Sequence, residues 1–310
     1  MEEADKNYQK GSEYLKTSFF KCRCNPDYNS AIPYLKLAAD GFHNSGKFDK
    51  EIETRNELIK CFKNEDSPWE EGNEHEKISE LQLKHLKSPS DAYGSIVKAY
   101  SAYSNDSKYD YAIKTLFKSS ENFLDNEYKS EAEKCLSSAF EGIKKYYHNI
   151  ILEDESPSYV YNTVDRYIDL LYNEKKYKKG IEVSEKFAEL IKKENKKEIN
   201  LIGKYHSFQA IGELSCNNQQ GYKKAIEKGM KIESQNGLSH KVNELINSVK
   251  KPDKIKSSLL NDINNKVPNS ITKMLNKYIK DNKVEEHIRF TNKGEDNNND
   301  EFTDYEEDLK

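Results

Sequence analysis

Apolar side chains recur along most of this chain at intervals of three and four residues, and Asn, Asp or Gly interrupts them about every 20 residues. This spacing places the apolar side chains on one face of a helix, and each interruption is typical of a turn. No segment alternates β-branched and polar residues as a half-buried strand would. The pattern therefore predicts an all-α protein. One representative stripe consists of Tyr28, Ala31, Ile32, Leu35, Ala39 and Phe42.

Two successive stripes form a repeat of about 40 residues, longer than the tetratricopeptide (TPR) repeat of about 34 but built in the same way. We predict a TPR-like, right-handed array of antiparallel helix pairs over residues 1–250. A small helical bundle should follow at 251–290, with short helices near 255–263 and 270–279. Residues 291–310 contain too few apolar groups to fold alone and are expected to form an acidic, disordered tail. Interruptions of the array are expected at 64–68 and 153–157.

The composition suits such a thin array. Apolar residues make up 35% of the 310 residues and charged residues 34%, with a mean hydropathy of -1.00. A two-layer helical array needs little apolar material, because each helix buries only one stripe. The net charge is -4, and residues 291–310 contribute eight acidic residues and two lysines, a net of -6. The remaining body is nearly neutral, which argues against nucleic-acid binding.

Three features predict a soluble cytoplasmic protein. The five cysteines have no regular spacing, which favours reduced thiols. The acidic start Met1–Asp5 does not resemble a signal peptide. No apolar run approaches the ~20 residues needed to span a bilayer.

No motif predicts catalysis, a metal site or a cofactor. Residues 41–48 nearly match the phosphate-binding loop, but Phe48 stands where that loop needs a hydroxyl, and a helix rather than a strand precedes it. This segment is better explained as a tight turn between paired helices. The seven histidines lack ligand spacing, and we expect the protein not to be an enzyme.

Two adjacent aromatic residues, Phe19 and Phe20, lie among Lys16, Lys21 and Arg23. Neighbouring helical side chains point about 100° apart, so both rings cannot easily enter one core stripe. One interpretation is that they cap the first helix and pack onto the second. The other is a loop tip in weak, reversible contact with an anionic membrane, in which Lys16 and Lys21 assist.

Four lysines cluster around one predicted turn: Lys175, Lys176, Lys178 and Lys179. A solvated surface in a lysine-rich chain would explain them. Alternatively, they form a basic strip that faces an acidic partner and speeds association.

Three segments resemble one known family. The first is Tyr14–Lys21 with Pro26–Ala31, the second runs from Leu37 to Lys50, and the third is the ending Glu306–Lys310. Together they resemble the soluble NSF attachment proteins (SNAPs). The start is closest to the gamma type, whereas the acidic-Leu-basic ending is similar to the alpha type, and the paralogue stays open. Clear similarity covers about the first 60 residues, and the middle matches in pattern only.

The resemblance implies an adaptor in vesicle fusion and membrane traffic. Such proteins bind the SNARE four-helix bundle along one face and recruit the NSF-type AAA+ ATPase through their carboxyl-terminal end. By resemblance, Phe19 and Phe20 would touch the membrane, Leu309 would help to stimulate the ATPase, and the acidic residues before it would meet basic patches. The candidate ATPase contacts are Glu306, Glu307, Asp308 and Leu309.

The expected protein is thus a cytoplasmic, peripherally membrane-associated adaptor, monomeric when free. The lysines around residue 175 are candidates for the SNARE-binding face. The alternative function is a TPR-type scaffold or co-chaperone that binds short peptides. Such a scaffold should place Asn and Lys at matching positions of successive repeats to hold a peptide.

Overall fold

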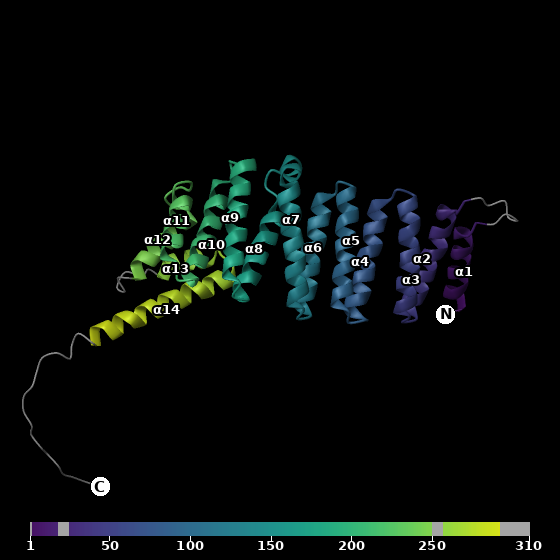
Figure 1. Cartoon of the computed structure of the whole chain (residues 1–310), viewed down its shortest axis with the longest axis horizontal. Coiled ribbons are helices and arrows are strands. Elements are labelled where there is room, and N and C mark those ends of the chain that lie inside the picture. Colours follow the sequence, from purple (N-terminus) through teal and green to yellow (C-terminus); the bar gives the residue numbers. More distant parts are fainter. Residues whose placement is uncertain (1, 18–24, 250–256, 292–310) are drawn as a thin grey trace, which may run out of the picture. The chain divides into compact units, whose positions relative to one another are not determined.

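The computed structural model describes residues 2–17, 25–249 and 257–291 of the chain. All regular structure in these ranges is helical (Figure 1). The helices are α1 (Glu2–Leu15), α2 (Tyr28–Asn44), α3 (Phe48–Asn64), α4 (Pro68–Lys84), α5 (Pro89–Asn105), α6 (Tyr109–Asp125), α7 (Lys129–Glu153), α8 (Ser158–Asn173), α9 (Tyr177–Glu194), α10 (Ile199–Ser215), α11 (Gln219–Met230), α12 (Leu238–Val249), α13 (Ser257–Asn264) and α14 (Asn269–Thr291).

The chain divides into two compact units, Met1–Leu170 and Leu171–Lys310. In the N-terminal unit each helix from α1 to α6 packs against the next (Figure 1). In this unit α2, α4 and α6 begin at Tyr28, Pro68 and Tyr109, so the repeat is about 40 residues, as predicted. In the C-terminal unit α9 packs on α10, and α10 to α14 pack among themselves as a small bundle. The all-α, TPR-like architecture is therefore confirmed, and the predicted boundaries at residues 250 and 290 stay predictions.

One turn geometry recurs between helices. In six turns a residue with positive φ ends the helix, and the next amide donates to the carbonyl five residues back, as Lys47 does to Phe42 at 2.9 Å. The next helix begins within two residues of this turn, so successive helices are antiparallel and adjacent. The positive-φ residues of these turns are Gly46, Asp66, Ser107, Glu127, Lys175 and Asn217.

This geometry accounts for most of the turns expected from sequence. The segment at 153–157 joins α7 to α8 without it, because Asp154 is extended, with φ -141° and ψ 108°. The segment at 41–48 is a helix-to-helix turn around Gly46, as predicted in place of a phosphate loop. The segment at 64–68 was expected to interrupt the array, but it is an ordinary turn of the same kind. It causes no break because Asp66 adopts positive φ and Pro68 starts α4, where its missing amide hydrogen costs nothing.

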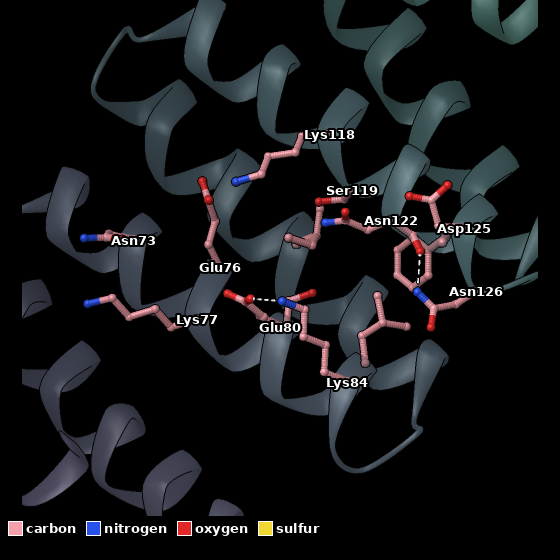
Figure 2. A pocket seen from close by; sticks show the side chains of 14 residues that line it. Asn73, Glu76, Lys77, Glu80, Lys84, Lys118, Ser119, Asn122, Asp125 and Asn126 are labelled. Carbon is pink, nitrogen blue, oxygen red and sulfur yellow. Dashed lines mark hydrogen bonds and ion pairs between the residues drawn. The ribbon is translucent and has the colours of Figure 1, made fainter. Parts of the chain in front are cut away.

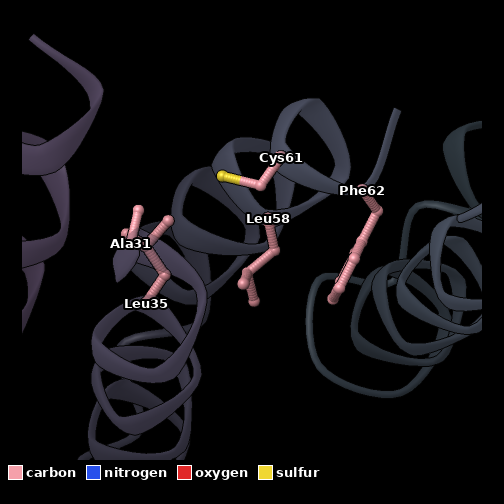
Figure 3. Packing of buried hydrophobic residues seen from close by; sticks show 5 residues of the cluster. All are labelled: Ala31, Leu35, Leu58, Cys61 and Phe62. Atoms are coloured by element: carbon pink, nitrogen blue, oxygen red, sulfur yellow. The ribbon is translucent and has the colours of Figure 1, made fainter. Parts of the chain in front are cut away.

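Small residues bring the helices together. Ala31 and Leu35 of α2 are fully buried against Leu58 and Cys61 of α3 (Figure 3). Gly72 of α4 goes further, because a Cβ there would lie 2.6 Å from the ring of Tyr103. Close packing of this kind explains how a chain with little apolar material still builds a core.

A buried ionic network crosses α3 and α4. Arg55 of α3 donates to Glu51 at 2.6 Å and to Glu74 of α4 at 2.7 Å, and both carboxylates are almost fully buried. His43 lies 2.9 Å from the other oxygen of Glu51, and Lys77 donates to the other oxygen of Glu74 at 2.7 Å. Each buried charge thus has a partner, which is the condition for burial to be tolerated.

The end of the chain differs from expectation. Instead of a short helix at 270–279, α14 runs from Asn269 to Thr291. No Gly or Pro lies between these residues, and several are good helix formers, so nothing stops the helix where the apolar pattern weakens. Within the described ranges no helix is long and apolar enough to cross a membrane. Cys61, Cys135 and Cys216 are free thiols, as predicted for these three.

Replacing Glu127 by glycine should stabilise the N-terminal unit by about 1 kcal/mol, because glycine adopts positive φ without the steric cost of a Cβ. Urea unfolding followed by circular dichroism would measure the gain. Glu127→Ala is the matched control, since it removes the same carboxylate but keeps the strain. Equal stability of the two variants would show that the turn is unstrained.

Replacing Arg55 by methionine should cost about 3–5 kcal/mol, because two buried carboxylates lose their shared cation. Urea unfolding can be followed through Trp69, since it is the only tryptophan and lies in α4 with Glu74. Lys84→Met is the control, because its ion pair with Glu80 is exposed and should contribute below about 1 kcal/mol. A loss no larger than that of the control would contradict the role of the network.

Candidate functional site

A polar groove lies between α4 and α6 in the N-terminal unit and has a volume of about 590 Å³ (Figure 2). Its walls are the second half of α4 and the last turns of α6, and Ile96 of α5 contributes to the base. The lining side chains labelled in the figure are Asn73, Glu76, Lys77, Glu80, Lys84, Lys118, Ser119, Asn122, Asp125 and Asn126. We call this surface the α4–α6 groove.

Several groups of the groove are held in place by internal contacts. Thr115 of α6 donates to Glu76 of α4 at 2.8 Å, which joins the two walls. Lys84 pairs with Glu80, and this hydrogen bond lowers the pKa of the Glu80 carboxyl. These side chains fix the shape of the groove.

Other groups are available to a partner. Lys118 is exposed on one wall, and neither it nor Asn73 makes a hydrogen bond or ion pair to another described residue. The same holds for the side chain of Asp125, across the groove from α4. The groove therefore offers a cation, an amide and an anion that can pair with polar groups on the surface of a partner.

A second, smaller cavity of about 340 Å³ shares Lys77, Glu80 and Lys84 with the groove. It extends the polar surface toward α2 and α3, where it meets His43 and the buried ionic network. His85 closes this side by stacking on Phe48, with ring centroids 3.8 Å apart. The histidines and acids form no metal site, since no group of three or more such residues in the described ranges could hold an ion.

An aromatic cluster lies at the other end of α4 and α6. The ring of Trp69 is 5.1 Å from that of Tyr103 and 4.7 Å from that of Tyr111. Tyr103 is buried, and desolvation followed by the charge of Glu76 raises the pKa of its hydroxyl. Tyr111 is 48% exposed, and the Lys114 ammonium lies 5.7 Å from its ring centre. Half-exposed aromatic rings beside polar groups are typical anchors of protein interfaces.

This arrangement favours recognition of a protein surface. Small-molecule sites are mostly apolar with few polar groups, whereas the α4–α6 groove is lined largely by charges of both signs and by amides. Such a lining matches a partner with mixed charges on its surface. The aromatic cluster would add apolar contact at one end.

The lysines predicted for partner binding lie in the C-terminal unit. Lys175, Lys176, Lys178 and Lys179 are all exposed and surround the turn between α8 and α9. Lys175 lies in the turn itself, with a φ of 57°, while Lys178 and Lys179 lie in the first turn of α9. The structure thus brings the four together on one turn.

The remaining predicted residues are mostly outside the described ranges. Lys16 is exposed, directly after the end of α1 at Leu15. Phe19, Phe20 and Lys21 lie outside the described residues. So do the four candidate ATPase contacts, Glu306, Glu307, Asp308 and Leu309.

Trp69, Tyr111 and Lys118 are not predicted from the sequence as binding residues. One signal was present, because Trp69 and Tyr111 lie in the first turns of α4 and α6, about one repeat apart. Matching positions across repeats would have pointed to this cluster. Nothing in the sequence marked Lys118 among so many lysines.

Comparisons with known proteins identify no family. No protein-family model and no curated protein matches the chain. Solved structures do match, among them BtubC (BKLC) from P. vanneervenii, at 11% identity over 74% of this chain and 89% of that one, with a TM-score of 0.33. A circular tandem repeat protein with a novel repeat topology and enhanced subunit contact surfaces matches at 9% identity over 85% of this chain and 66% of that one, with a TM-score of 0.36.

Proposed function

We propose that this chain is a non-catalytic adaptor of the SNAP type. It would bind SNARE four-helix bundles and recruit an NSF-type AAA+ ATPase that takes them apart. It would act in the cytoplasm as a monomer with weak peripheral membrane contact, and nucleic acid would not be a partner. The observation that carries the proposal is the block of family-like residues from Tyr14 to Lys50, supported by the ending Glu306–Lys310.

The fold supports this proposal at the first helix pair. α1 ends at Leu15 and α2 begins at Tyr28, so Phe19 and Phe20 fall in the sequence that connects two helices. Tyr14 stacks on Tyr34, with ring centroids 5.8 Å apart, and Asp27 caps α2 by accepting from the Ser30 amide at 3.0 Å. Both ends of the connection are therefore fixed, which suits a segment that presents aromatic side chains to a membrane.

The α4–α6 groove supports binding of a helical bundle. The outer surface of such a bundle carries charged residues of both signs, as the flanking positions of coiled coils do. Lys118, Asn73 and Asp125 supply groups of matching kind. Contacts of this type are individually weak, so an adaptor could bind and release its cargo repeatedly.

The lysine cluster supports attraction of an acidic face. Lys175, Lys176, Lys178 and Lys179 concentrate positive charge on one turn. Such a cluster raises association rates toward an acidic partner more than it raises affinity. The tail acids would act in the same way toward basic patches of the ATPase.

One observation favours the second candidate, a peptide-binding scaffold. The α4–α6 groove brings together amides and lysines from two successive repeats, although its asparagines do not occupy matching positions of those repeats. Such groups can bind the backbone of a peptide. Asn73 and Lys84 come from α4, Lys118 and Asn122 come from α6, and Asn126 directly follows α6. Binding of short peptides but not of bundles would favour this reading.

Replacing Lys175, Lys176, Lys178 and Lys179 by glutamate should weaken binding to an immobilised SNARE bundle at least about tenfold at low salt, because four favourable rim charges are reversed. Pull-down with and without the ATPase would measure this loss. The difference should shrink in high salt as the charges are screened.

The control carries the same charge change on four exposed lysines of the N-terminal unit, Lys6, Lys87, Lys98 and Lys108. Retained binding by the control and loss by the lysine-cluster variant is the expected outcome. If the unaltered protein binds neither bundle nor ATPase, the adaptor proposal fails. A change in Trp69 fluorescence on adding unstructured peptides would then favour the scaffold.

Replacing Phe19 and Phe20 by serine should reduce flotation with anionic liposomes, because two membrane-inserted rings contribute several kcal/mol at most and are lost together. Stability should stay within about 1 kcal/mol, as expected at exposed sites. Disassembly of detergent-solubilised SNARE complexes should change little. If the variant unfolds instead, the two rings belong to the core.

A further inference from the structure

The C-terminal unit contains a cavity of its own, of about 590 Å³. It lies between the start of α9, the turn that joins α10 to α11, and α14. Ile211 and Leu214 of α10 and Leu275 of α14 are buried and give it an apolar floor. Tyr177 and Tyr278 add aromatic walls. We call it the α10–α14 cavity.

The rim of this cavity is mainly basic. Lys175 and Lys277 line it from opposite elements, and Asp281 is its one acidic lining residue. Both lysines are exposed, and neither makes a hydrogen bond or ion pair with another described residue. Lys273 and Lys280 are also exposed and lie four residues before and three after Lys277, on the same face of α14. An apolar floor inside a rim with more lysines than acids fits a peptide that is both acidic and aromatic.

The chain itself contains such a peptide. Phe302, Tyr305 and Leu309 are spaced by three and four residues, so they would share one face of a helix. The other positions are mostly acidic: Asp300, Glu301, Asp304, Glu306, Glu307 and Asp308. The segment therefore carries both features that the cavity would select.

The connection is long enough. From Asn282, the last cavity residue, α14 rises about 14 Å to Thr291. The residues from 292 to 302 can span up to about 36 Å, which exceeds the return distance. A tethered segment also has a high effective concentration at a nearby site, so modest affinity suffices.

We propose that residues 300–309 bind in the α10–α14 cavity of the same chain, with Phe302, Tyr305 and Leu309 on the apolar floor and the acidic residues against Lys175 and Lys277. Docking covers the lysine turn and the apolar groups of the tail at once. One consequence rests on the proposed function. In a free chain both the SNARE-facing lysines and the ATPase contacts would be covered until a partner displaced the tail.

Zero-length carbodiimide crosslinking of the full chain tests the docking, because it joins a carboxylate to a lysine amine only where the two are in contact. Peptide mass spectrometry should find the tail acids joined to Lys175 and Lys277, with the neighbouring lysines as minor sites. Mixing isotope-labelled and unlabelled chains distinguishes bonds within one chain from bonds between chains. High salt should lower the yield.

Two variants are compared, one that removes the proposed apolar contact and one that serves as the control. Phe302→Ser with Tyr305→Ser keeps every charge but removes the apolar contact, and should lower these crosslinks about tenfold, the factor that about 1.4 kcal/mol represents. Asn297→Ser with Asn298→Ser changes the same tail outside the proposed contact and should leave them unchanged. The proposal is overturned if crosslinks are absent, if they spread equally to Lys192 in the last turn of α9 and Lys196 just after that helix, or if they join only different chains. These results do not depend on whether SNARE complexes bind.

Discussion

In the N-terminal unit each helix buries its apolar stripe mainly against its neighbours in the chain, and the rest of that unit follows from this constraint. Helices α1 to α7 pack in sequence, and small residues such as Ala31 and Gly72 allow close approach. Nearest-neighbour burial needs few apolar residues per helix. It therefore leaves a large polar surface that core formation does not use.

The spare surface is where binding chemistry collects. In the α4–α6 groove, some polar groups hold the walls together, such as Thr115 with Glu76, while Lys118 and Asp125 have no described partner. A repeated fold can present such groups at regular intervals without disturbing its core. This separation of core and surface would suit the proposed adaptor, because its partners could be exchanged while the scaffold stays intact.

Not all polar groups stay at the surface. Arg55, Glu51 and Glu74 lie in the interior of the N-terminal unit, where they pair with one another and with His43 and Lys77. A network of this kind contributes little net stability compared with apolar packing, but it penalises any shift of α3 against α4. It therefore defines the register of two helices whose polar side chains also line the cavity next to the groove.

The sequence by itself determined the local structure: helices from the three- and four-residue spacing, and turns from Asn, Asp and Gly. These features depend on neighbours in the chain, so periodicity reports them directly. It failed at α14, where a weak apolar pattern hid a long helix that no Gly or Pro ends. Only the tertiary structure decided which polar residues meet. Trp69 contacts Tyr111, and Thr115 donates to Glu76, although the members of each pair are far apart in sequence. They meet because packing sets the rotation of each helix, which composition and spacing leave free.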